Sequence, residues 1–151
     1  MYLIGDEMKE FLESSVAVII GTADRDGRPH VTSGWGPRVG VSRATLTVFL
    51  EEGRAAATLA DLRATHRIAA TVADPVSYRS VQLKGRSMET GAPTEADEAW
   101  VRRHREGFRS VTALVGDPPG TVRWMESVTR VVFAIEKAFD QTPGAGAGRE
   151  L

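Results

Sequence analysis

The chain of 151 residues contains no cysteine and carries a formal net charge of −1 at pH 7. The lack of cysteine excludes disulfides, thiolate metal sites and thiol catalysis, and the near-neutral charge gives no general attraction to nucleic acid or to a membrane surface. No apolar run approaches the roughly 20 residues of a membrane-spanning helix, and the acidic N-terminus does not resemble a signal peptide. We therefore expect a soluble, cytoplasmic protein with one domain over residues 1–140 and no metal site.

The first half of the chain alternates apolar runs with turn signals. Residues 16–23 form a continuous apolar run, which predicts a strand buried on both faces, and Gly27 ends the turn that follows it. An alanine-rich stretch after the third strand has high helix propensity. The predicted elements of this half are a short helix capped by Asp6, strands at 16–23, 29–35 and 44–50, and a helix at 54–64.

The second half adds three strands and a helical insertion. Thr94 and Asp97 form a pattern like a capping box, and Asp117-Pro118 resembles the start of a second, shorter helix. The predicted elements are strands at 68–73, 78–84 and 128–139, a helical insertion at about 94–126 and a glycine-rich tail at 141–151. Within the insertion we expect Trp100, Phe108, Val111 and Val115 on one stripe of the first helix, with Trp124 and Met125 in the second.

Six strands joined mostly by hairpin-length turns predict a mainly β fold, an antiparallel barrel with peripheral helices. His30, His66 and His104 lie in different predicted elements and form no cluster with carboxylates. Unrelated histidines are therefore the first interpretation, and an axial haem ligand or a general base stays open. The sequence contains no H-E-x-x-H, G-x-S-x-G or Walker motif.

Basic residues cluster around the predicted helix at 54–64. A helix that begins at the end of a strand presents free backbone N–H groups, which suit a phosphate. Arg54 would lie in the first turn, where a cation is disfavoured unless an anion is bound nearby. One interpretation is a phosphate clamp; the alternative is that Arg54 pairs with Glu51 or Glu52 and the others form a solvated face. The set consists of Arg54, Arg63, Arg67, Lys84 and Arg86.

Several polar and aromatic side chains could contact a flat ring. Gln82 offers a donor and an acceptor, which would suit the edge of an isoalloxazine or deazaflavin, although Ser80, Gln82 and Lys84 could equally face water. Trp35 and Trp124 could stack on such a ring, pack in the core or contact a partner subunit. Thr32 and Ser33 could bond a ligand edge or merely fill space.

Four segments follow one another in a distinctive order: VAVIIGTADRDGRPHVTSGWG, TLTVFL, GRAAATLADLRATHRIAATVADP and YRSVQLKGR. This order resembles the flavin-binding split β-barrels of the pyridoxamine 5′-phosphate oxidase-like family. The resemblance covers about residues 8–90, with a closing strand near 128–139. It implies a six-stranded antiparallel split barrel that forms a homodimer, with two flavin sites at the subunit interface.

The resemblance also implies roles for particular residues. Arg54 and Thr58 match positions that hold the phosphate, although residues 55–57 are alanine where many members carry a lysine, and Asp61-Leu62 replaces Asn-Leu. Further positions match contacts to the ring from the second, third and fifth strands. Together with Trp35, the candidate cofactor-binding residues are Thr32, Ser33, Phe49, Arg54, Thr58, Gln82 and Lys84.

We therefore expect an FMN-binding protein that acts as a flavin-dependent oxidoreductase on an unknown small molecule. A deazaflavin-dependent reductase remains an alternative, since Arg38, Arg43 and Arg63 could meet an acidic tail. A non-catalytic flavin- or haem-binding module is a third possibility. The cofactor performs the chemistry in flavin enzymes, so the lack of an obvious acid–base residue does not exclude catalysis. Pyridoxamine phosphate oxidase activity itself is not expected, because a helical insertion follows residue 90.

Overall fold

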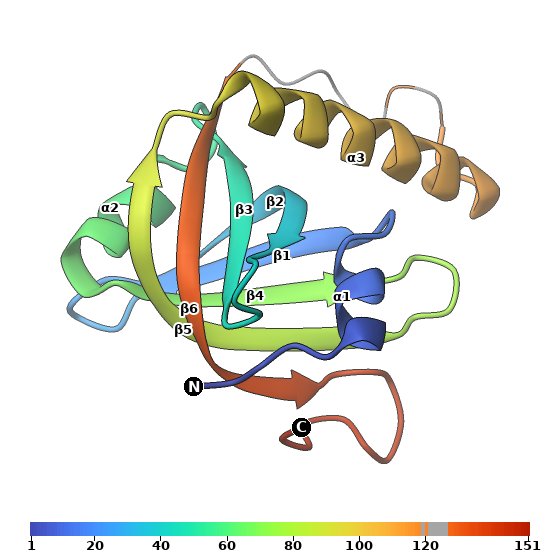
Figure 1. Ribbon diagram of the computed structural model, residues 1–151, viewed down its shortest axis with the longest axis horizontal. Helices are drawn as coiled ribbons and strands as arrows, with labels where there is room; N and C mark the ends of the chain where they lie inside the picture. Colours follow the sequence, from blue (N-terminus) through green and yellow to red (C-terminus); the bar gives the residue numbers. More distant parts are fainter. Residues whose placement is uncertain (119, 121–126) are drawn as a thin grey trace.

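The structure is a computed structural model that describes residues 1–118, 120 and 127–151. Six antiparallel strands form a closed barrel in the order β1-β2-β3-β6-β5-β4, which confirms the predicted fold class (Figure 1). The elements are α1 (Asp6–Leu12), β1 (Ala17–Ala23), β2 (Pro29–Val39), β3 (Thr45–Glu51), α2 (Ala56–Thr65), β4 (Arg67–Ala73), β5 (Ser80–Gly91), α3 (Glu95–Leu114) and β6 (Val128–Asp140). No helix within the described ranges has the length and apolar character to cross a membrane.

Strand β1 is buried on one side only, which corrects the prediction of burial on both faces, whereas residues 46–50 of β3 are all buried. The even-numbered residues of β1, such as Val18 and Ile20, fill the barrel, whereas Ile19 points outward and is 50% exposed. A closed antiparallel barrel has its core on one face of each strand, so an unbroken apolar run need not be enclosed on both faces. The interior is filled by side chains of every strand, with Leu46, Leu83 and Phe133 among the fully buried ones.

Several predicted boundaries shift. Strand β2 continues past Trp35 because a bulge, with Gly36 at a φ of +53°, lets the chain bend and resume pairing with β3. Strand β5 extends to Gly91, while Tyr78 lies in the turn before it. Gly5 rather than Asp6 is the N-cap of α1, and the Asp6 carboxylate instead accepts a hydrogen bond from Arg43.

Helix α3 lies along the outside of the barrel (Figure 1), against β2. Its predicted capping box is present, with Thr94 and Asp97 each accepting a hydrogen bond from the other's backbone N–H. The predicted apolar stripe is wrong at Val115, which is the C-cap and half exposed. The face turned toward the barrel instead carries polar groups with specific partners: Asp97 binds Arg38 and Arg130, and His104 binds two backbone groups.

One predicted element of the second half cannot be compared with the structure. The short helix predicted from Asp117 through Trp124 and Met125 falls mainly on residues 119 and 121–126, which lie outside the described part of the chain. The glycine-rich tail folds back on the end of β6. The N–H of Leu151 donates to the Ala138 carbonyl at 2.9 Å, and the N–H of Gly148 donates to the Asp140 carbonyl at 2.7 Å.

His104 connects α3 to the first two strands. The Gly36 N–H donates to Nδ1 of His104, and Nε2 donates to the Val16 carbonyl, each at 3.0 Å. These two bonds require the neutral ring with its proton on Nε2, because a protonated Nδ1 could not accept from Gly36. Burial lowers the pKa of His104 to about 4, outweighing the hydrogen bond to Val16, which acts in the opposite direction.

The depressed pKa predicts a loss of stability in mild acid. The unfolded chain binds a proton at His104 near pH 6.5 and the folded chain only near pH 4, so stability is complete above pH 6.5 and falls as the pH drops to about 4. The expected loss is about 3 kcal/mol of unfolding free energy. Urea unfolding at pH 7.5 and 4.5 should show this loss in the natural protein and much less of it in His104→Gln. An equal loss in both would exclude His104 as the cause, and His66→Gln, at an exposed position, is the control.

Candidate functional site

Four neighbouring strands present an outward surface of mostly small side chains. We call this surface, on the outward side of β2, β1, β4 and β5, the outer face. Strand register places Ser33, Ile19, Thr71 and Gln82 in one row across it, and Val31, Gly21, Ala69 and Lys84 in the next. The amide of Gln82 donates to the Thr71 hydroxyl at 3.0 Å, which leaves the Gln82 carbonyl oxygen without a hydrogen bond among the described residues.

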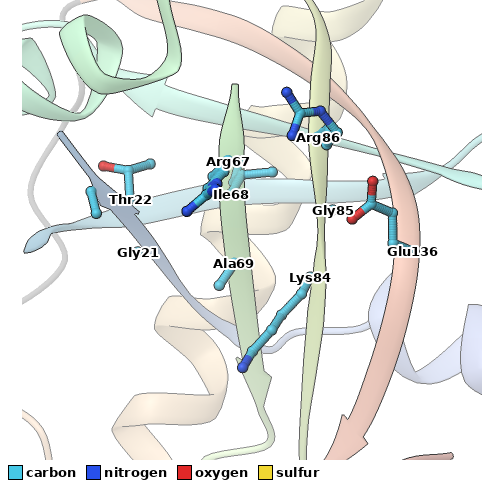
Figure 2. A pocket seen from close by; sticks show the side chains of 10 residues that line it. Gly21, Thr22, Arg67, Ile68, Ala69, Lys84, Gly85, Arg86 and Glu136 are labelled. Carbon is cyan, nitrogen blue, oxygen red and sulfur yellow. The ribbon is translucent and has the colours of Figure 1, made fainter. Parts of the chain in front are cut away.

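A pocket of about 560 Å³ opens on the outer face between β1, β4, β5 and β6. Figure 2 shows its lining: Gly21 and Ala69 have almost no side chain, and three cations and one carboxylate surround them. The charged residues are Arg67, Lys84, Arg86 and Glu136. A shallow floor of small residues with cations around it is a suitable receptor for a flat ligand that carries an anionic group.

The cations of this pocket form no ion pair with the described residues. Arg67 and Arg86 are cross-strand partners, and neither forms an ion pair within residues 1–118, 120 and 127–151. Lys84 lies over the ring of Phe139, with Nζ 4.8 Å from its centroid. Like charges directly opposite each other on adjacent strands are destabilising, and a bound anion would remove this repulsion.

The opposite side of the pocket depends on an irregularity in pairing between β5 and β6. Lys84 pairs with Lys137 and the next residue, Gly85, pairs with Ile135, so Glu136 is an extra residue on β6. Gly85 allows this close approach, since a Cβ there would collide with the Ala134 carbonyl oxygen. Bulges re-aim side chains, and this one turns Glu136 outward at the pocket.

The structure brings together only some of the sequence-predicted residues. Ser33, Trp35, Gln82 and Lys84 lie on the outer face. Thr32 lies on the opposite side of β2, Thr58 is buried in α2, Phe49 is enclosed beneath α3 and Arg54 is exposed in the turn before α2. Of the predicted basic set, Arg67, Lys84 and Arg86 meet at one pocket, which Arg54 and Arg63 do not line.

The start of α2 differs from the prediction. The helix begins at Ala56, so Arg54 precedes its first turn, and its side chain is 64% exposed with Nε 3.8 Å from Glu51. This geometry agrees with the alternative interpretation, in which Arg54 is an ion-pair partner of Glu51. The N-terminus of α2 has no side-chain cap. Glu51, the last residue of β3, and Glu52, in the turn after it, bring two carboxylates close in sequence to Arg54, where a phosphate clamp would form.

Asp61 is a buried residue whose role the sequence did not indicate. Its Oδ2 accepts hydrogen bonds from the Thr22 hydroxyl at 2.7 Å and from Nδ1 of His30 at 2.8 Å. These bonds fasten α2 to the hairpin of β1 and β2. Asp61 is one helical turn from Thr58, so its carboxylate adds a second reason why the start of α2 is a poor place for an anion.

Trp35 packs against α3. Its ring centroid is 6.0 Å from that of His104 and 5.8 Å from that of Phe108, and the Arg105 guanidinium carbon lies 4.9 Å away on the ring face. Its Nε1 is buried and has no hydrogen-bond partner in the described structure. Most of the ring is therefore used to hold α3 against the outside of the barrel.

The sequence model of the pyridoxamine 5′-phosphate oxidase family matches residues 4–141. The chain belongs to this family. No curated protein matches its sequence.

Solved structures of several other proteins share the fold. HupZ from Group A Streptococcus is 16% identical with a TM-score of 0.57, covering 97% of this chain and 100% of that one. An F420 reductase is 15% identical with a TM-score of 0.59, covering 89% and 98%. An FMN-binding protein from Syntrophomonas wolfei subsp. wolfei is 16% identical with a TM-score of 0.55, covering 88% and 85%. At these identities the likeness concerns the fold.

The tight pairing at the pocket predicts that this family member needs glycine at position 85. Gly85→Ala should lower the unfolding free energy by roughly 1–3 kcal/mol or more, because its Cβ cannot fit beside the Ala134 carbonyl without moving β6. Gly91→Ala in the same strand is the control, since nothing lies within 4 Å of its Cβ position. Thermal unfolding measures both, and equal melting temperatures for the two variants would contradict the argument.

Proposed function

We propose that the protein binds a flavin-type cofactor, FMN in the first place, on the outer face and acts as a flavin-dependent oxidoreductase on a small molecule. The observation that carries this proposal is the pocket of about 560 Å³ with three cations around a floor of small residues. Membership of the pyridoxamine 5′-phosphate oxidase family and the likeness to an FMN-binding protein and an F420 reductase support it.

The residues present suit the two parts of such a cofactor. Arg67, Lys84 and Arg86 would hold the phosphate, which arginine pairs through two parallel N–H bonds. A flat ring would lie over Gly21 and Ala69, where side chains are short. The free carbonyl oxygen of Gln82 would accept a hydrogen bond from a ring N–H. When bound, the flavin would supply hydride or electron transfer, and the protein would supply position and charge.

Two alternatives fit the described residues less well. A deazaflavin with an acidic tail would need additional cations, but Arg38 is paired with Asp97, Arg43 is paired with Asp6, and Arg63 does not line the pocket. An axial haem ligand would need an accessible histidine beside the outer face. None of the three histidines lines the pocket: His104 is enclosed with both ring nitrogens bonded, His30 lies on the opposite side of β2, and His66 is the C-cap of α2. A flavin-binding protein without catalytic activity would use the same pocket, and substrate turnover is the test between the two.

The outer face also supports the proposal of a homodimer. Ile19 is 50% exposed and Val31 70% exposed on adjacent strands, next to the alanine and glycine residues of the same face. Apolar side chains grouped on the exposed face of a sheet are a suitable interface for a second copy of the chain. A second subunit there would also enclose a cofactor bound in the pocket.

Loss of pocket arginines should weaken FMN binding. Arg67→Ala or Arg86→Ala removes a charge-assisted contact of about 1.5–3 kcal/mol, which corresponds to roughly tenfold weaker binding or more. Arg54→Ala should change little, because that side chain is exposed and paired with Glu51. Fluorescence titration with FMN measures all three variants, after the absorption spectrum of the purified protein has shown whether a flavin is retained.

The opposite ranking of the three variants would contradict the proposed position of the phosphate. If Arg54→Ala weakens binding while the two pocket variants do not, the phosphate binds at the start of α2. If the folded natural protein takes up no FMN, the proposed function is wrong.

A charge on the outer face should disrupt the homodimer. Ile19→Asp would place a carboxylate in the proposed interface and should make the protein monomeric. Light scattering at micromolar protein concentration measures this change. Val41→Asp is the matched control, because Val41 is fully exposed in the turn between β2 and β3. A natural protein that is already monomeric, or an Ile19 variant that remains dimeric, would exclude this interface.

A further inference from the structure

Glu136 reaches the pocket because of the bulge in β6. On either side of the irregularity, Ile135 points into the barrel core and Ala138 is fully buried, whereas Glu136 and Lys137 are both exposed. Regular alternation would allow only one of these two adjacent side chains to face outward. The bulge and the glycine opposite it therefore place a carboxylate at a pocket that is otherwise basic.

This carboxylate has no ion-pair partner in the described residues, although Lys84 and Arg86 line the same pocket. Lys137, the next residue, is instead paired with Glu150 at 3.4 Å. Glu136 is therefore not explained as the counterion of a neighbouring cation. With three cations and the one carboxylate of Glu136, the pocket carries a formal net charge of +2.

A net charge of +2 on the pocket is balanced by one phosphate monoester, which carries a charge of about −1.5 to −2 at pH 7. A ligand with a second anionic group near the phosphate would exceed this charge. On the β6 side of the pocket that group would meet the carboxylate of Glu136 in place of a cation (Figure 2). Like charges brought together at a partly desolvated surface are repelled more strongly than in water.

We propose that Glu136 is a specificity-determining residue that cancels the electrostatic advantage of a second anionic group, so that ligands with an acidic extension, such as diphosphates or deazaflavins with a carboxylate tail, gain nothing over a single terminal phosphate, as in FMN. The inference rests on the proposed function for the identity of the cofactor. The selection itself concerns the anion alone, so it is testable without any ring.

The test compares methyl phosphate with methyl diphosphate by the shifts of backbone amide signals of Ala69 and Gly85 in NMR spectra. In the natural protein the two affinities should lie within about threefold, despite the greater charge of the diphosphate. In Glu136→Gln the diphosphate should gain about tenfold and the monophosphate less than threefold, because only the second phosphate lies against position 136. Glu106→Gln on α3 makes the same charge change at an exposed position away from the pocket and should alter neither.

Two results would overturn the inference: a natural protein that prefers the diphosphate by tenfold or more, or a Glu136→Gln variant that strengthens both ligands equally. Signals of Ala69 and Gly85 that move with neither ligand would also exclude it, even if FMN binds elsewhere. The same variants titrated with FMN and with F420 separate the two proposals. If the anion pattern holds and FMN does not bind, the proposed function is wrong and the selection for one phosphate stands.

Discussion

The pairing of β6 with both β3 and β5 closes the barrel, and the rest of the architecture depends on this closure. Once every strand has a neighbour on each side, each residue must point either into a shared core or outward. Arg67 and Arg86 are brought together in this way by the pairing of β4 with β5, although 18 residues lie between them in the sequence. The same closing strand carries the bulge at Glu136, so one element provides both the enclosed core and the far side of the pocket.

Helix α3 then determines which part of the outside remains accessible. It covers Phe49 completely and most of Trp35, with Asp97 and His104 as its polar attachments to the strands. Among the described residues, no helix covers the outward sides of β1, β4 and β5 in this way, and the large apolar side chains exposed there are Ile19 and Met88, with Val31 on the neighbouring β2. The insertion thus limits the candidate site to the outer face by occupying the alternative surface.

Local signals in the sequence are sufficient to predict most of the fold. The hairpin at Gly27, the capping box at Thr94 and the strand alternation at Gln82 are each determined by neighbouring residues, and all are present. The candidate site was predicted less well, because it depends on pairing over long distances. Arg54 was assigned importance from its position beside a helix start, but an ion pair with Glu51 was equally consistent with the sequence. Glu136 gave no signal at all, since a bulge is visible only once the register of β5 against β6 is known.

The distribution of charge decides between the two places where an anion could bind. At the start of α2 the helix dipole favours an anion by about 0.3–1 kcal/mol, but Glu51, Glu52 and the buried Asp61 oppose it. The pocket contains three cations and one carboxylate, and the pairing of β4 with β5 keeps two of the cations, Arg67 and Arg86, opposite each other. The described charges therefore support the proposal of a phosphate at the pocket rather than at the start of α2. Lys84 and Glu136 are the pocket side chains that could move a proton, whereas in the proposed function the bound flavin would supply the electron or hydride transfer and the protein would hold it in position.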